Sequence, residues 1–363
     1  MLKLKTRLKN FLSSRIDAAV SSSIHAAVNS FFARSQLLNK NQQPTGSADK
    51  IMIRYLSLNN KALAHYIAEE LKKEIAKRPI PESPGIYHLN SKVSTQEDIE
   101  SDWSRYWIRE LGKDFNFHRK NWEQSYVLQV LFEHGMLQEG KKGLGLGCGR
   151  EPLPSYLIKR GCEITAGDKP GEDNNGDWVK GGQYTESLSD LFYEHLVDIT
   201  TFKSKLELRY VDLTQIPPEL FGLYDFCWSV CVIEHIGSIQ AGLDFLKNSL
   251  NLLKPGGISV HTTEFNFLDT PQTIDNCGSV LFKKEHIEYL VEEIGKLGGE
   301  VIGADFSYGN KIFDLYIDNP PYFHQEIEGI NIKYPPYSVP HIKLLIDGFP
   351  ATCFGVIIKK KAI

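Results

Sequence analysis

The sequence predicts a doubly wound α/β domain with a seven-stranded, mostly parallel sheet and a helical N-terminal extension. From residue 142 onward, short apolar runs alternate with helical segments, which is the pattern of a parallel α/β sheet. The first apolar run leads into a glycine-rich turn, and a proline-led helix follows it. Before residue 142, apolar residues recur at helical spacing. Together these observations predict the fold class.

Length and composition are those of an ordinary globular protein. The chain has 363 residues, of which 42% are hydrophobic and 24% charged, enough for one large domain with additions or for two domains. A formal net charge of −4 argues against a nucleic-acid partner held by a broadly basic surface. The six cysteines show no Cys-x-x-Cys spacing, and no apolar run approaches the roughly 18 residues of a membrane span. We therefore expect a cytoplasmic protein with reduced cysteines.

Residues 1–45 are predicted to form a basic amphipathic helix and a linker. Apolar residues recur every fourth position, and the positive charge is concentrated near the start. We expect residues 1–40 to mediate self-association or peripheral contact with the inner membrane, and an inert tail is the alternative. Residues 46–140 form a helical region, with helices expected at about 58–77, 103–111 and 122–137.

Residues 141–363 form the predicted α/β domain. The expected strands cover residues 144–146, 163–166, 206–210, 225–230, 258–263, 301–306 and 352–359, with helices at about 188–196 and 283–297. A Tyr/Pro-rich stretch, residues 307–350, is long for a connection inside a compact domain and is interpreted as a lid.

The strongest local signal is Gly143-Leu-Gly-Leu-Gly-Cys-Gly-Arg-Glu-Pro. Gly147 and Gly149 allow a sharp turn and a close ligand approach, and Pro152 suits the first turn of a helix. Dinucleotide binding requires Gly-x-Gly-x-x-Gly, and neither glycine register supplies the third glycine. A phosphate-binding loop of the Walker type also fails, because no Gly-Lys-Ser/Thr follows.

S-adenosylmethionine, which carries no phosphate, suits this turn better. It needs a close backbone approach, a carboxylate for the ribose diol and a polar group for the adenine. Asp168 ends the second predicted strand, where a carboxylate accepts both ribose hydroxyls, and Asp212 follows the third strand.

With the later segments Tyr224-Asp-Phe-Cys-Trp-Ser and Leu252-Leu-Lys-Pro-Gly-Gly, the chain resembles the class I S-adenosylmethionine-dependent methyltransferases, which have a Rossmann-like fold. The resemblance covers residues 142–306. It implies that residues Gly147, Cys148, Gly149, Glu151, Asp168, Asp212, Leu213 and Ser229 bind the cofactor. Two positions depart from the family pattern: Gly145 replaces the usual acid of the first strand, and Glu151 replaces the third glycine and is a candidate substitute for that acid.

A narrower resemblance covers residues 115–160 and 224–266. There the chain is similar to an uncharacterised bacterial methyltransferase group associated with glycan biosynthesis, through His118-Arg-Lys-Asn-Trp and His261-Thr-Thr-Glu-Phe-Asn. This similarity implies a glycan or related small molecule as the methyl acceptor.

The candidate catalytic residues are Glu264, His235 and His261. Methyl transfer needs alignment of the acceptor, and a hydroxyl acceptor benefits from a general base. Glu264 ends a strand at the edge where open α/β sheets bind ligands, His235 follows the fourth strand, and His261 lies inside a strand, where packing is the alternative role.

We expect no metal in the reaction. Ubiquinone-pathway and small-RNA methyltransferases of this class bind a divalent cation through Glu-x-x-Glu-His, and the corresponding segment here is Cys231-Val-Ile-Glu-His. A cysteine is a poor ligand for Mg²⁺. The function that the sequence predicts is S-adenosylmethionine-dependent methyl transfer to oxygen, and a non-catalytic scaffold that kept the cofactor fold is the alternative.

Overall fold

The structure is a computed structural model that describes residues 46–168, 188–320, 322, 325–327, 330–332 and 338–362. It divides into two compact units, Met1–Leu63 with Gln325–Ile332, and Ala64–His324 with Lys333–Ile363. The predictions for residues 1–45, and the part of the insertion that covers residues 169–187, lie outside the described residues.

The first unit holds the start of a long helix and a small hairpin. Helix α2 (Gly46–Ala76) continues into the second unit, and strands β9 (Gln325–Ile327) and β10 (Ile330–Ile332) pair antiparallel. Several large apolar side chains near the start of α2 are exposed, among them Met52 and Ile53. Nowhere in the described part of the chain does a helix combine the length and apolarity needed to cross a bilayer.

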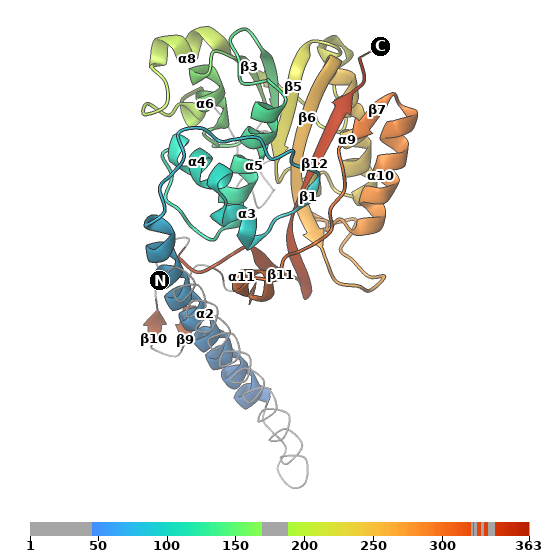
Figure 1. Ribbon diagram of the computed structural model, residues 1–363. Helices are drawn as coiled ribbons and strands as arrows, with labels where there is room; N and C mark the ends of the chain where they lie inside the picture. Colours follow the sequence, from blue (N-terminus) through green and yellow to red (C-terminus); the bar gives the residue numbers. More distant parts are fainter. Residues whose placement is uncertain are drawn as a thin grey trace, which may run out of the picture. The chain divides into compact units, whose positions relative to one another are not determined.

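The second unit is built on one large sheet, shown in Figure 1, with the strand order β4-β3-β2-β5-β6-β12-β11-β8. Its strands are β1 (Lys92–Val93), β2 (Lys142–Leu146), β3 (Glu163–Asp168), β4 (Leu206–Tyr210), β5 (Tyr224–Val230), β6 (Leu253–Asn266), β7 (Gly299–Val301), β8 (Ile317–Asp318), β11 (Lys343–Ile346) and β12 (Phe349–Lys360). The neighbouring strands β4, β3, β2, β5 and β6 are all parallel, whereas β12 runs antiparallel to β6. The predicted α/β class is confirmed.

The strand count differs from the prediction, because the sheet has ten strands instead of seven. Strands β6 and β12, with 14 and 12 residues, are longer than the other strands. Parts of β12 also pair with β1, β7 and β11. The added strands β1, β8 and β11 have only two to four residues each, and β8 and β11 lie inside the stretch 307–350 that the sequence analysis interpreted as a lid.

Helices cover both faces of the sheet (Figure 1). One apolar core contains residues of α4 (Asp102–Glu110), α5 (Arg119–Glu133) and α6 (Leu153–Lys159), and the other contains residues of α9 (Ile239–Leu252) and α10 (Lys284–Lys296). Side chains alternate between the cores along β5: Phe226 and Trp228 enter the first, and Cys227 enters the second. The shorter helices are α3 (Gln96–Glu100), α8 (Ile199–Lys205) and α11 (Ile312–Leu315).

Helix α5 is almost entirely buried. His118 caps it, since its Nδ1 accepts a hydrogen bond from the backbone N–H of Lys120 at 3.1 Å. The cap starts the helix at Arg119, earlier than the predicted residue 122, and Gly135, with φ of 69°, follows its end. The early start places Arg119 and Glu123 one turn apart on the same face.

Two predicted elements differ in the structure. The helix expected at 188–196 is a short 3-10 turn, η2 (Leu188–Leu191), and the strand expected at 301–306 ends at Val301. Within the stretch 307–350, α11, β8 and β11 belong to the second unit, and β8 and β11 are strands of its sheet. The lid interpretation also depends on residues outside the described part and stays a prediction.

Candidate functional site

The predicted glycine turn joins β2 to α6. Gly147 and Gly149 have φ of 69° and 52°, which is the left-handed conformation that favours glycine. The N–H of Gly147 donates to the carbonyl of Gly167 at 2.8 Å, and a Cβ on Gly147 would stand 2.7 Å from Val232. Both the conformation and the neighbouring side chain therefore require glycine at this position.

Asp168 lies beside this turn. Its Oδ2 accepts a hydrogen bond from the N–H of Gly149 at 3.2 Å, so the end of β3 is linked to the turn after β2. Asp212, after β4, is exposed, and its Oδ1 accepts hydrogen bonds from the N–H and the hydroxyl of Thr214 at 2.8 and 2.7 Å. Leu213 is half-buried against the core of the α9 face.

The turn lies where the order of the parallel strands reverses. From β2 the chain adds β3 and then β4 on one side, and it later adds β5 and β6 on the other side. Ligands of open α/β sheets bind at such a switch point, outside the carboxyl ends of the strands. The structure therefore places the turn, Asp168 and the end of β5 at the edge where this fold class binds ligands.

Gly145 is closely surrounded, which explains why no acid occupies the position. A Cβ there would stand 2.3 Å from Sγ of Cys148 and 2.5 Å from the ring of Trp228. Glu151 is buried, and its Oε1 accepts a hydrogen bond from Nε1 of Trp228 at 2.7 Å. Burial raises the pKa of Glu151 to about 8. Glu151 is thus hydrogen-bonded to Trp228, the same side chain that fills the space beside Gly145.

Ser229 and His261 form a buried pair across β5 and β6. The serine hydroxyl lies 2.8 Å from Nδ1 of His261, and both side chains are at most 1% exposed. Burial lowers the pKa of His261 to about 3, so the imidazole is neutral near pH 7. His261 packs edge-on against Phe245 of α9, which places the pair on the α9 face.

The other two candidate catalytic residues lie apart from this pair. Glu264, which is 4% exposed, forms an ion pair with Arg119 of α5. His235 is exposed in the short turn η4 (Ile233–His235), and its Nδ1 lies 2.9 Å from the carbonyl oxygen of Gly278. The structure therefore does not bring Glu264, His235 and His261 together as one catalytic group.

Glu264 belongs instead to a polar group packed beneath α5, which we call the α5 cluster and which consists of Arg119, Lys120, Glu123, Cys231, Thr262, Glu264 and Cys353. Glu123, at its centre, accepts hydrogen bonds from the Cys353 thiol at 3.0 Å, the Thr262 hydroxyl at 3.1 Å and the Lys120 ammonium at 3.2 Å. Nη1 of Arg119 lies 3.7 Å from Sγ of Cys353 and 4.0 Å from Sγ of Cys231.

The cationic side chains keep Glu123 ionised in this cluster. Burial alone would raise the pKa of the carboxyl, but Lys120 and Arg119 hold it below its usual value. The pKa of Arg119 is raised in turn by the neighbouring thiols and Glu123, against the effect of burial. The cluster is therefore a charged, hydrogen-bonded group inside the protein.

Sequence reasoning did not assign roles to Glu123 or Cys353. Glu123 resembles any polar residue of an amphipathic helix, and Cys353 lies in an apolar strand far along the chain. Their pairing at 3.0 Å depends on the packing of α5 against β12. The sequence contains no local signal that would have identified it.

A cleft of the second unit, with a volume of about 550 Å³, lies along the end of α2 and α4. Its lining is notably basic: Lys72, Ile75, Ala76, Arg78, Ile80, Arg105, Ile108, Arg109, Gly112, Lys113 and Phe115. It includes no residue of the glycine turn or of the α5 cluster.

Comparisons with known proteins give weak similarities. No family model matches the chain, and no curated protein matches it. Among solved structures, a putative sarcosine dimethylglycine methyltransferase from Galdieria sulphuraria is 16% identical over 72% of this chain and 99% of that one, with a TM-score of 0.40. Magnesium protoporphyrin IX methyltransferase from Synechocystis is 11% identical over 70% and 92% of the two chains, with a TM-score of 0.38. At these values the similarities establish neither a family nor an activity.

Proposed function

We propose that this chain is an S-adenosylmethionine-dependent methyltransferase. The observation that supports it most strongly is the left-handed glycine turn at the switch point of the sheet, with the carboxylate of Asp168 hydrogen-bonded to Gly149. A backbone-lined turn with an adjacent carboxylate suits a nucleoside that carries no phosphate, and the sequence lacks the motifs of dinucleotide and Walker-type sites.

In this proposal the cofactor lies across the carboxyl ends of β2 to β5. Gly147, Cys148 and Gly149 shape the turn against which it packs, and Asp168 binds the ribose hydroxyls. Asp212 and Leu213 contact the adenine, because an exposed carboxylate and a half-buried apolar side chain follow β4 there. Ser229, the next-to-last residue of β5, borders the methionine end. Glu151, hydrogen-bonded to Trp228, borders the turn.

The proposed acceptor is a hydroxyl of a glycan or a related small molecule. The transferred methyl group leaves a sulfonium, so the protein has to align the acceptor oxygen with that methyl group and accept the hydroxyl proton. Glu264 suits the second task best, since its Oε2 has no hydrogen-bond partner among the described residues. Arg119 holds the other oxygen and orients the carboxylate. His261 is enclosed and neutral, which favours a packing role.

The test is calorimetric titration of the full chain with S-adenosylmethionine, S-adenosylhomocysteine and NAD. We expect the first two to bind and NAD not to bind. Asp168→Ala should weaken S-adenosylmethionine by at least about tenfold, because charge-assisted hydrogen bonds worth roughly 1.5–3 kcal/mol are lost. The matched control is Asp244→Ala on α9, which removes a carboxylate paired with Lys247 on the other face and should leave the affinity unchanged.

Unchanged affinity in folded Asp168→Ala would contradict the proposed placement of the cofactor. Binding without methylation of any hydroxyl acceptor would support the non-catalytic scaffold instead. Mass spectrometry of glycans from cells with and without the gene tests the acceptor class, since the proposal requires the gain of a methyl group.

A further inference from the structure

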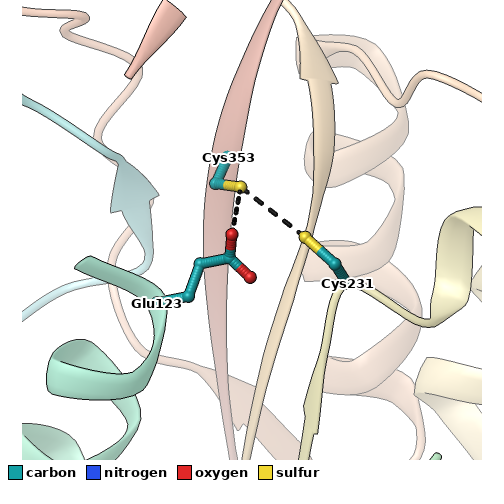
Figure 2. A group of neighbouring side chains, drawn as sticks. All are labelled: Glu123, Cys231 and Cys353. Carbon is teal, nitrogen blue, oxygen red and sulfur yellow. Dashed lines mark hydrogen bonds between the residues drawn. The ribbon is translucent and has the colours of Figure 1, made fainter. Parts of the chain in front are cut away.

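Two thiols and a carboxylate converge in the α5 cluster, as Figure 2 shows. Glu123 comes from α5, Cys231 follows β5, and Cys353 lies in β12, so three separate elements supply them. One oxygen of Glu123 and the two sulfur atoms all lie within 4.8 Å of one another. A group of this composition offers the atoms that a thiophilic divalent cation binds.

The spacing of the two sulfur atoms is close to that of tetrahedral coordination. Two thiolates bound to one tetrahedral Zn²⁺ at about 2.3 Å stand about 3.8 Å apart. The sulfur atoms of Cys231 and Cys353 lie 3.7 Å apart in the structure. Sγ of Cys353 and Oε1 of Glu123 lie 3.0 Å apart, which has to widen by about half an ångström around a bound ion.

Two buried carboxylate oxygens beside these residues have no hydrogen-bond partner in the described part of the chain. They are Oε1 of Glu234 and Oε2 of Glu264, and the two side chains are 0% and 4% exposed. Each carboxylate has an oxygen within 4.8 Å of the sulfur of Cys231. Unpaired buried oxygens are costly, and a cation bound at Cys231 would interact favourably with both.

The backbone at Cys231 is also unusual. Its φ of 51° is left-handed, which is rare for a residue other than glycine and strains the backbone. Its N–H donates to the carbonyl and the hydroxyl of Thr262, at 3.0 and 3.1 Å, and these bonds keep the conformation. The conformation holds the side chain of Cys231 at the α5 cluster, which is consistent with a functional position.

We propose that Cys231, Cys353 and Glu123 bind one thiophilic divalent cation of the Zn²⁺ class. Binding replaces the two thiol protons, which are released to solvent, and the cation bonds to two thiolates and one carboxylate oxygen. Thr262 and Lys120 hold the second oxygen of Glu123, and the guanidinium of Arg119 lies near both sulfurs, so polar groups already orient the ligands.

This site differs from a magnesium site. Mg²⁺ requires oxygen ligands in near-octahedral geometry, whereas this group supplies two sulfur atoms. The partly exposed Cys231 gives a route of entry from solvent. The proposal concerns metal binding and does not depend on the proposed methyl transfer.

The test uses the full chain, reduced and stripped of metal, with Co²⁺ as a spectroscopic probe. We expect one Co²⁺ per chain with a thiolate-to-metal charge-transfer band that Zn²⁺ abolishes by displacement and Mg²⁺ does not. Cys231→Ser and Cys353→Ser should each weaken Co²⁺ binding by more than about a hundredfold. Loss of a residue that only orients a ligand weakens metal binding by up to about a hundredfold, so a larger loss indicates a direct ligand. Cys277→Ser removes an exposed cysteine outside the cluster and serves as the matched control, with full binding expected.

Glu123→Gln should lower the affinity while keeping the thiolate band, because both sulfur ligands remain. Circular dichroism checks the fold of each variant. If the more buried Cys353→Ser does not fold, the result for Cys231→Ser tests the proposal by itself. No stoichiometric Co²⁺ uptake, or a band that survives Cys231→Ser, would overturn the proposal. Displacement of Co²⁺ by Mg²⁺ would also overturn it, since carboxylates without the thiolates would then be the ligands. Loss of both thiols to a disulfide without metal uptake would show a redox pair instead.

Discussion

The carboxyl edge of the sheet has two parts that are built differently. The glycine turn and Asp168 fall between residues 143 and 168, and the hydrogen bond between Asp168 and the backbone of Gly149 links them. The α5 cluster, a few strands along the same edge, is held by side chains such as Glu123 and Cys353, which are 230 positions apart in the chain. The first part therefore depends mainly on backbone conformation, and the second depends on how helices and strands pack.

This difference has an energetic consequence. A backbone turn tolerates changes of neighbouring side chains as long as its glycines remain. A buried charged group is stable only while each member keeps its partners, because an unpaired buried charge is costly. We therefore expect single substitutions in the α5 cluster to destabilise the fold more than those around the turn.

The largest expected effect is that of Glu123→Ala. The change removes the acceptor for Cys353, Thr262 and Lys120 at a position that is 0% exposed. Breaking a buried ion pair costs 3–5 kcal/mol, and we expect about 3 kcal/mol because Lys120 keeps some access to solvent. Chemical denaturation of the metal-free chain measures the free energy of unfolding.

Glu163→Ala is the matched control for Glu123→Ala. Glu163 forms an exposed ion pair with Lys142 at 3.6 Å, and its loss should change the free energy of unfolding by less than about 1 kcal/mol. Equal effects of the two substitutions would contradict the view that the α5 cluster is a cooperative buried group.

A smaller effect is expected for Gly145→Ala beside the turn. The added Cβ would meet Cys148 and Trp228 at 2.3 and 2.5 Å, and overpacking of this kind costs about 1–3 kcal/mol. Gly295→Ala on α10 is the control, since no atom lies within 4 Å of its added Cβ and alanine favours a helix. A thermal-melt comparison in which Gly145→Ala is as stable as Gly295→Ala would show that this part of the turn is not tightly packed.

A separate effect, on the pH dependence of stability, concerns Glu151. Its pKa of about 8 in the fold lies above the ordinary value of 4.5, so its stabilising contribution is complete below pH 4.5 and is lost as the pH rises toward 8. Glu151→Gln keeps an acceptor for Trp228 but cannot ionise. As the pH rises through this window, the wild type should therefore lose stability relative to the variant, by up to about 1.4 kcal/mol per pH unit in the free energy of unfolding. Parallel pH profiles of the two proteins would mean that Glu151 is ionised in the fold.

The sequence by itself determined the α/β class, the approximate positions of the central strands along the chain and the glycine turn. The periodicity of apolar residues and the conformational freedom of glycine involve only a few neighbouring positions, so they can be read from the amino-acid sequence. Asp168 was predictable for the same reason, since it ends the strand after the turn.

Only the tertiary structure decided the surroundings of Gly145, the pairing of Ser229 with His261 and the α5 cluster. A cross-strand partner depends on register, and the contact between α5 and β12 depends on how the helix packs on the sheet. The sequence shows Glu123 as one polar residue of a helix and Cys353 as one small residue of a strand. Their charge and hydrogen bonding affect stability strongly only after folding removes both side chains from water. Burial makes an unpaired polar group costly and strengthens the hydrogen bonds of a paired one.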